Sequence, residues 1–251
     1  MKSGFTAALL AITLTLGCSG VAEAQAPNLA QANAVDPFDA AVAAYNRNDY
    51  ATAVSLFRSL AAQGDVMAQY NLGLMYDNGT GVAQDYKEAV RLYGLAAAQG
   101  LAKAQSNLGV MYANGQGVAQ DYKEAVRLYG LAAAQGNAKA QFNLGVKYDN
   151  GQGVAQDYKE AARLYGLAAA QGNAGAQSNL GVMYSNGQGV AQDYVRAHMW
   201  YNLGASSLSG EEGKIATSNR DNIAKMMTPQ QIAEAQAMAR KCQASNFKKC
   251  D

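Results

Sequence analysis

The feature that most constrains this 251-residue sequence is a segment that recurs every 36 residues. Residues 82–100 are identical to residues 118–136, and residues 154–172 differ from both only by Ala162 in place of valine. A fourth copy begins at Val190 and then diverges. Repetition in register with a period of about 20–50 residues is typical of solenoids, in which a unit that cannot bury its own apolar side buries it against its neighbours.

Each unit predicts two helices joined by a glycine-rich loop. In the second unit, the first helix is predicted over residues 102–113, because apolar residues recur there at the spacing of a helix face. These residues are Ala104, Leu108, Met111 and Tyr112. Gly115 is predicted to end this helix, since glycine adopts the left-handed conformation found after a helix C-terminus, and Gly117 allows a second bend.

The second helix of the same unit is predicted to begin at Asp121. Its carboxylate can accept hydrogen bonds from the free N–H groups of the first turn, and Glu124 completes a capping-box pattern. Gly136 is predicted to end the helix. The predicted buried face consists of Tyr122, Ala125, Val126, Tyr129, Ala132 and Ala133.

The repeated residues carry a family resemblance. In the first unit the pattern consists of Ala68, Leu72, Gly73, Tyr76, Gly79, Gly81, Val82, Asp85, Tyr86, Ala89, Ala97, Ala98 and Gly100. This pattern, which extends over residues 65–206, resembles the Sel-1-like repeat. The resemblance implies an all-α fold: an αα-superhelix, or right-handed solenoid of helix-turn-helix repeats, related to tetratricopeptide arrays. It also implies an adaptor that binds a protein or peptide, in that family often with a regulatory or host-directed role.

Capping segments are predicted on both sides of the repeats. The predicted organisation is an N-terminal tetratricopeptide-like unit over residues 36–64, repeats over 65–208, C-terminal capping helices over 209–242 and a tail over 243–251. The first helix is expected to begin at Pro37, with an apolar stripe of Phe38, Val42 and Tyr45. The last helix is expected to begin after Thr228, with Gln231 completing a capping box.

The N-terminus has the pattern of a signal peptide. A basic n-region and a short apolar run lead to Ala22-Glu23-Ala24, an A-x-A cleavage site, so residues 1–24 are predicted to be removed. Residues 25–35 are interpreted as a disordered leader. A bacterial lipoprotein signal ending at Cys18 is the alternative. Either way, we expect a periplasmic or secreted bacterial protein without an integral membrane segment, because no apolar run reaches the length of about 20 residues that spans a bilayer.

The charge and the cysteine content restrict the classes of ligand. A formal net charge of +1 gives no basic excess to neutralise phosphates, so nucleic acid is not an expected partner. His198 is the only histidine, and we predict no metal site and no cofactor. Beyond Cys18, Cys242 and Cys250 remain. In an oxidising compartment they are expected to form a disulfide, and two free thiols are the alternative.

The sequence offers few groups for catalysis, and we predict that the chain is not an enzyme. The repeated Asp/Glu pairs are explained by helix capping. Ser245 and Lys248 match the S-x-x-K motif of serine β-lactamases, but the companion motifs are missing. Some cysteine-rich Sel-1-like relatives are described as β-lactam-binding or β-lactam-hydrolysing, so a β-lactamase-like hydrolase is one alternative function. A structural envelope component is the other.

A partner-binding surface is predicted on the first helix of each unit, opposite the core-facing stripe. The predicted residues are Met67, Tyr70, Leu74, Asp77, Lys103, Ser106, Val110, Lys139, Phe142, Val146, Asp149, Ser178 and Val182. These positions vary between copies that are otherwise nearly identical. Tyr70 and Phe142 are expected to point outward into a concave groove that accepts an extended peptide or a helix. The invariant Asn71, Asn107, Asn143 and Asn179 are expected to bond to backbone between helices. The sequence makes no prediction about the oligomeric state.

Overall fold

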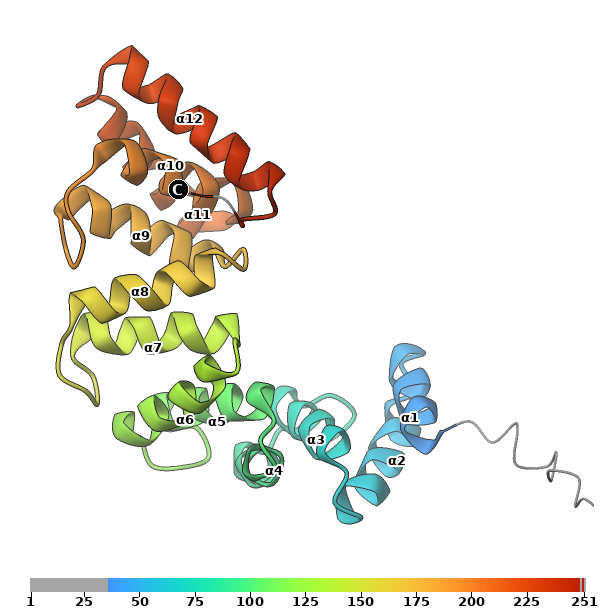
Figure 1. The fold of residues 1–251 in the computed structure, drawn as a ribbon. Helices are drawn as coiled ribbons and strands as arrows, with labels where there is room; N and C mark the ends of the chain where they lie inside the picture. Colours follow the sequence, from blue (N-terminus) through green and yellow to red (C-terminus); the bar gives the residue numbers. More distant parts are fainter. Residues whose placement is uncertain (1–35, 249, 251) are drawn as a thin grey trace, which may run out of the picture. The chain divides into compact units, whose positions relative to one another are not determined.

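The 36-residue period becomes a pair of packed helices that repeats along the chain (Figure 1). The computed structural model describes residues 36–248 and residue 250, and within them it contains twelve α-helices and no strand. The first helices of the repeated units are α3 (Val66–Asn78), α5 (Ala102–Asn114), α7 (Ala138–Asn150) and α9 (Ala174–Asn186). The second helices are α4 (Tyr86–Ala98), α6 (Tyr122–Ala134), α8 (Tyr158–Ala169) and α10 (Tyr194–Ser207).

Two helices precede the repeats and two follow them. Helices α1 (Pro37–Asn46) and α2 (Tyr50–Ala62) form the N-terminal pair, and α11 (Gly210–Ala224) and α12 (Pro229–Ala244) follow α10. From α1 to α10, each helix packs against the next one in the chain. The predicted signal peptide and leader, residues 1–24 and 25–35, lie outside the described residues.

Local sequence signals set the helix ends largely as predicted. Gly115 follows α5 with φ 67°, and α5 is one residue longer than expected. The Asp121 carboxylate accepts from the N–H groups of Lys123 (2.8 Å) and Glu124 (3.0 Å). At the last helix, the capping box of Thr228 and Gln231 is confirmed.

The capping box predicted at Glu124 is wrong. Its carboxylate pairs with the Arg127 guanidinium at 2.6 Å, on the solvent side of α6. The backbone N–H of Asp121, which the Glu124 side chain was expected to bind, donates instead to the carbonyl of Tyr112 at 2.9 Å. Because the loop folds back onto the end of α5, this donor is already satisfied, and Glu124 remains available for an arginine.

A glycine–tyrosine contact brings the two helices of each unit close together. A Cβ atom at Gly109 of α5 would lie 2.7 Å from the ring of Tyr129 of α6, so only glycine fits there. The other units repeat this contact with the pairs Gly73–Tyr93, Gly145–Tyr165 and Gly181–Tyr201. Tyr129 is 2% exposed, and burial raises the pKa of its hydroxyl well above the ordinary value.

A second glycine fixes the contact between successive units. Gly117, in the loop after α5, has φ 69°, and a Cβ atom there would clash with the backbone carbonyl of Tyr86 at the start of α4. Gly153 and Gly189 press in the same way on Tyr122 and Tyr158. The Gly-x-Gly loop therefore ends one helix at its first glycine and allows close contact with the preceding unit at its second.

Buried glutamines connect the units through a ladder of hydrogen bonds that the sequence analysis missed. Gln141 is 4% exposed; its Nε2 donates to the carbonyl of Ala133 at 3.2 Å, and its Oε1 accepts from Gln171 Nε2 at 2.8 Å. Gln69 and Gln105 accept from Gln99 and Gln135 in the same way. The recurrence of these glutamines at the same position of every copy was the sequence feature that could have predicted the ladder. A buried amide needs hydrogen-bond partners. The carbonyl that each glutamine binds belongs to the preceding unit, and the amide that donates to it follows the second helix of the same unit.

The buried face of α6 differs in part from the expectation. Leu128 is 3% exposed because it packs into a core cluster formed by α4 of the preceding unit and α5 of its own unit, and the pattern of one unit does not show the contact with α4. Tyr122, Val126 and Ala133 are half-buried. In α1, Tyr45 was expected in the apolar stripe but is 39% exposed, with its ring 5.3 Å from that of Tyr50.

Helices α11 and α12 both pack on α10 and close the last unit (Figure 1). Met199 and Leu203 of α10 are fully buried beneath them, whereas the equivalent Arg163 and Leu167 of α8 are exposed. Cys242, at the end of α12, is joined to Cys250 by a disulfide with a Cα–Cα distance of 4.4 Å.

Candidate functional site

The predicted partner-binding residues recur at equivalent positions of α3, α5, α7 and α9, and we call this row the A-helix face. Met67 (38% exposed), Val182 (36% exposed), Lys103 and Lys139 are exposed on it. Half-buried positions are Tyr70, Leu74, Asp77, Val110, Phe142, Val146, Asp149 and Ser178. Ser106 is buried at 1% exposure, so its expected outward orientation is wrong.

Tyr70 and Phe142 do not point fully outward as expected. The Tyr70 ring lies 5.9 Å from the ring of Tyr93, and the Phe142 ring lies 5.9 Å from that of Tyr165. Each ring therefore covers the buried tyrosine of its own unit and shows only part of its surface to solvent. A ring has enough area to serve the core on one side and the surface on the other.

The carboxylates of the row are tied to the same buried tyrosines. Asp77 accepts a hydrogen bond from the Tyr93 hydroxyl at 3.0 Å, and Asp149 accepts one from the Tyr165 hydroxyl at 3.2 Å. Burial, followed by the charge of the aspartate, raises the pKa of each of these tyrosines. The two carboxylates therefore orient the core rings in addition to facing the surface.

The invariant asparagines do not bridge helix backbones as expected. Asn71 Nδ2 donates to the carbonyl of Met67, one turn earlier in its own helix, at 2.9 Å. The Asn107 side chain lies close to the hydroxyls of Tyr70 and Tyr93 and opposes the rise in their pKa that burial causes.

A hollow of about 450 Å³ opens on the A-helix face between α7, α9 and α11. Three predicted residues line it: Phe142, Ser178 and Val182. Helix α11 contributes apolar and acidic groups that the sequence analysis did not include, among them Ile215, which is 52% exposed, and Glu212. The available signal for this contribution was the isolated apolar pair Ile215-Ala216 within the polar stretch 211–222.

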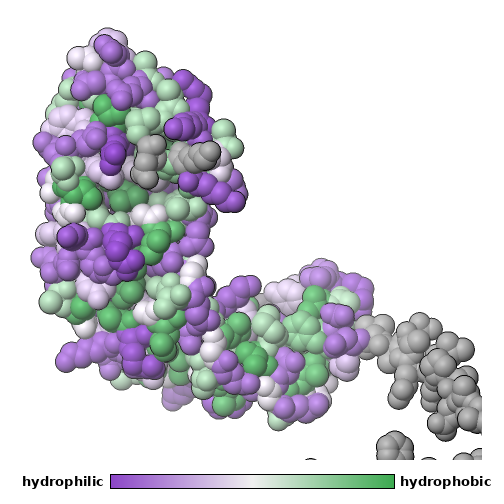
Figure 2. Space-filling view, in the orientation of Figure 1, coloured by the Kyte–Doolittle hydropathy of each residue, from purple (hydrophilic) through white to green (hydrophobic). Residues whose placement is uncertain are grey.

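A smaller hollow of about 260 Å³ lies at the other end of the row, between α1, α2 and α3. Leu74 and Asn71 line it together with Val42, Tyr45 and Phe57. The A-helix face therefore has an apolar hollow near each end. Figure 2 shows how hydrophobic (green) and hydrophilic (purple) side chains alternate over one face of the described helices.

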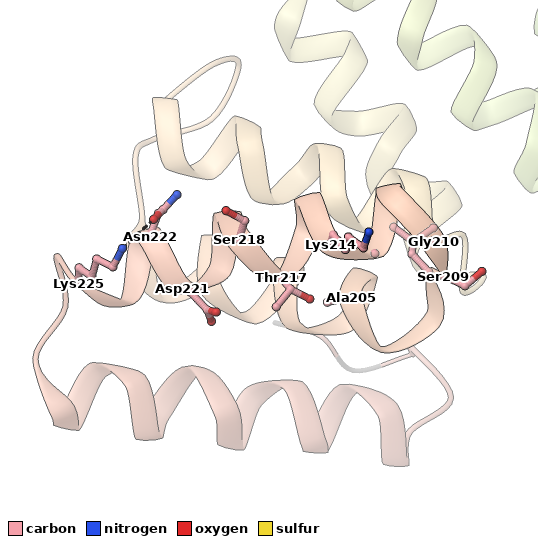
Figure 3. Close-up of a pocket in the computed structure, with 11 residues that line it drawn as sticks. Ala205, Ser209, Gly210, Lys214, Thr217, Ser218, Asp221, Asn222 and Lys225 are labelled. Atoms are coloured by element: carbon pink, nitrogen blue, oxygen red, sulfur yellow. Dashed lines mark hydrogen bonds between the residues drawn. The ribbon is translucent and has the colours of Figure 1, made fainter.

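A hollow of about 650 Å³ on the other side of α11 is polar and open (Figure 3). Its charged groups are paired along the helix: Lys225 Nζ donates to Asn222 Oδ1 at 3.0 Å, and Asp221 binds Arg220 at 2.8 Å. Apart from Ala205 and Leu208, the lining consists of glycine, polar and charged residues, whereas a typical binding pocket is lined mainly by hydrophobic side chains.

The residues considered for chemistry lie apart. Buried His198 packs against α11, and the Ser245 hydroxyl donates to the carbonyl of Cys242 at 2.8 Å. Over residues 36–248 and 250, no group of three or more His, Cys, Asp or Glu side chains is placed to hold a metal ion. In the same part of the chain, no helix combines the length and the apolar character needed to cross a bilayer.

Comparisons with known proteins agree with this architecture. The Sel1 repeat model matches residues 46–65, 66–101, 102–137, 138–173 and 174–207. The fold resembles that of a protective antigen of uropathogenic Escherichia coli strains that displays an SLR fold, with 34% sequence identity and a TM-score of 0.72. The match covers 78% of this chain but only 42% of that antigen.

A Sel1 repeat protein from Oxalobacter formigenes is also similar, with 28% identity and a TM-score of 0.65, over 82% of this chain and 99% of that one. A search of curated protein sequences gives no significant match. The predicted fold class, an all-α repeat superhelix, is confirmed. Because the repeat model matches most of the sequence and the helices follow its period, the chain belongs to the Sel1 repeat family.

Proposed function

We propose that this protein is an exported scaffold that binds an extended segment of a protein partner along the A-helix face. The observation that carries the proposal is the hollow of about 450 Å³ between α7, α9 and α11. It combines partly exposed Val182 and Ile215 with the half-buried ring of Phe142. Apolar anchors seated in a hollow and surrounded by polar groups are typical of the centre of a protein interface.

The separation of the two hollows along the row favours an extended protein segment over a small molecule as the ligand. The two hollows lie on α1–α3 and on α7–α11, and exposed Lys103 and Lys139 stand on the helices between and beside them. A partner that uses both hollows has to follow the row across several units. Sel1 repeat scaffolds typically mediate protein–protein interactions, which agrees with this arrangement.

The proposed location is the periplasm or the exterior of a bacterial cell. The support is the signal-peptide pattern that ends at Ala24, together with the pair Cys242 and Cys250, which form a disulfide. The similar Escherichia coli protein is described as a protective antigen, which fits an exported protein. Fusing residues 1–24 to a reporter that is active only after export tests this location directly, and retention of the reporter in the cytoplasm contradicts it.

The binding surface is tested by photo-crosslinking in the native host, followed by mass spectrometry. A photoreactive amino acid at Ile215 or Val182 is expected to capture the same partner, because both side chains line one hollow. The matched control places it at Met226, which is also on the C-terminal side of the repeats and is 57% exposed, but lies outside the hollow. Equal capture from all three positions contradicts the assignment.

Substitution then tests the partner found in this way. Ile215→Glu is expected to weaken its binding at least about ten-fold, since a charge replaces an apolar anchor, which is worth about 1–2 kcal/mol. Met226→Glu is expected to leave binding unchanged. Both residues are at least half-exposed, so the melting temperature of each variant should remain that of the wild type.

We infer that binding, not catalysis, is the activity. The S-x-x-K serine, Ser245, donates its hydroxyl proton to a backbone carbonyl, and Lys248 is exposed. Purified protein is therefore expected not to hydrolyse nitrocefin. Turnover that is lost in Ser245→Ala would instead support the β-lactamase-like alternative.

A further inference from the structure

The second helices carry a groove of their own, which recurs from unit to unit. Between α6 and α8, a groove of about 410 Å³ is lined by Gly130, Ala134, Leu144, Leu164 and Leu167. One unit later, between α8 and α10, the equivalent residues Gly166, Ala170, Leu180 and Trp200 line a groove of about 390 Å³. We call these grooves the B-grooves, and each lies on the second helices, away from the hollows of the A-helix face.

Part of the groove between α8 and α10 is covered by a segment of the same chain. Phe247, Lys248 and Cys250, which follow α12, line it. The Phe247 ring lies against Gly172: a Cβ atom built there would be 3.2 Å from ring atom Cε2. At the equivalent Gly136, nothing lies within 4 Å of such an atom.

The chain holds this phenylalanine in a constrained turn. The disulfide between Cys242 and Cys250 closes the segment, and the N–H of Phe247 donates to the carbonyl of Cys242 at 2.9 Å. Asn246 and Phe247 have φ values of 53° and 62°, in the left-handed region that residues other than glycine seldom adopt. The ring is thus presented to the groove by a rigid turn.

The other copies of the groove are uncovered. Leu167, which lines the groove between α6 and α8, is 42% exposed. Leu95 and Leu131 are 42% and 44% exposed at the same position of α4 and α6. Residues 82–100 and 118–136 are identical, so the groove between α4 and α6 has the same lining as the one between α6 and α8.

We propose that the two open B-grooves each receive an aromatic side chain from a rigid turn of a partner protein, as the closed B-groove receives Phe247. The internal contact indicates the chemistry of the occupant: a phenyl ring that lies against the glycine after a second helix, here Gly172, and faces a groove lined by small and aliphatic side chains. This second binding surface lies on different helices from the A-helix face, so the two sites are separable by mutation.

The probe for the test is a synthetic peptide with the sequence of residues 241–250, closed by its disulfide. The effective concentration of a segment tethered by a short link is on the order of millimolar, so the free peptide is expected to bind with a Kd of about 1 mM or tighter. Binding to the full-length protein is followed by NMR through the backbone amides of Gly130, Gly136 and Leu167. The same peptide with alanine in place of phenylalanine is the control and is expected to bind at least about ten-fold more weakly.

A matched pair of protein variants locates the site. At Gly94 and Gly130 a Cβ atom would meet nothing within 4 Å, so a side chain there starts in open space, and Gly94→Leu combined with Gly130→Leu is expected to obstruct both open grooves. This double variant is expected to bind the peptide at least about ten-fold more weakly while its circular dichroism and melting remain native. Ala119→Leu, at an exposed loop position, is the control and should bind as the wild type does.

Phe247→Ala provides an independent readout. Removing the internal ring opens the third groove, so the number of bound peptides should rise from two to three, with new shifts at Gly166 and Gly172. Three outcomes overturn the proposal: no binding at several millimolar peptide, equal binding of the phenylalanine and alanine peptides, or unaltered binding to the double variant. Concentration-dependent dimerisation of the wild type that disappears in Phe247→Ala would also overturn it, because the occupant would then be a second copy of this chain.

Discussion

At the scale of single residues, Gly109 and Gly130 have different roles in the structure, although glycine recurs at both positions in successive units. Gly109 is required by contact, because a Cβ atom would lie 2.7 Å from the ring of Tyr129. Gly130 faces open space. Glycine is therefore required for packing in α5, whereas in α6 it only lowers the stability of the helix.

This difference gives opposite predictions for one substitution. Gly109→Ala is expected to lower the free energy of unfolding by about 1–3 kcal/mol, since the buried tyrosine has to move. Gly130→Ala is expected to raise it by about 0.5–1 kcal/mol, because alanine is the better helix former. Urea unfolding followed by circular dichroism measures both. Destabilisation of similar size by the two substitutions would contradict the role assigned to the Gly109–Tyr129 contact.

His198 is a second position where one residue has a distinct effect. It stands where the earlier copies have Val90, Val126 and Ala162, and it is 3% exposed with no partner for Nδ1 among the described residues. Burial, followed by the nearby positive charge of Arg220, lowers its pKa below the ordinary value of 6.5, and Asp221 opposes this only in part. The fold therefore favours the neutral imidazole.

The sign of the pH effect follows from this shift. Below pH 6.5 the unfolded chain binds a proton that the folded chain resists, so stability is complete above that pH and decreases as the pH falls below it. His198→Val restores the residue of the earlier copies and is expected to flatten the dependence between about pH 7.5 and 5.5. Urea midpoints at several pH values test this, and parallel curves for the two proteins would contradict it.

At the scale of the elements, the glutamine ladder determines how firmly a helix pair is connected to its neighbour. Gln141 has a partner at both ends of its amide, Ala133 and Gln171. Gln177 donates to the carbonyl of Ala169, but its Oε1 has no partner among the described residues. The reason is visible in the sequence: the position equivalent to Gln171 in the fourth unit is occupied by Ser207.

Gln141 and Gln177 differ in their number of hydrogen-bond partners, so substitutions at the two positions can be compared with each other. Gln141→Met is expected to cost about 1–2 kcal/mol, because it removes both hydrogen bonds of a buried amide, the one to the carbonyl of Ala133 and the one from Gln171. Gln177→Met removes one bond but also an unsatisfied oxygen, so its cost should be smaller by about 1 kcal/mol. Thermal and urea unfolding measure the difference. Equal costs would show that the pairing between glutamines contributes little.

At the scale of the whole molecule, stability is expected to be shared among similar units. Removing residues 102–137 deletes 36 residues, one complete period, and joins Leu101 to Ala138. Since the new neighbours have nearly the same sequence as the old ones, the shortened protein should fold, with a smaller m value in urea because less surface is exposed on unfolding. Circular dichroism and urea titration test this.

The control for this deletion removes half a period. Deleting residues 102–119 takes away α5 but leaves α6 without the glycine that Tyr129 packs against. That protein is expected to aggregate or to unfold without a cooperative transition. If both shortened proteins behave alike, the 36-residue pair is not the folding unit.

The sequence by itself determined the period, the two helices of each unit, most of their ends and the fold class. These features depend on short-range chemistry: apolar spacing along one helix, aspartate and threonine at N-termini, and glycine at C-termini. Only the tertiary structure decided that Tyr70 and Phe142 cover buried tyrosines, that Ser106 is buried and that Glu124 binds Arg127. It alone also placed Phe247 in the last B-groove. Those outcomes depend on which surfaces meet between residues far apart in the chain, and a helical pattern within one unit specifies the face of a residue but not the neighbour that covers it.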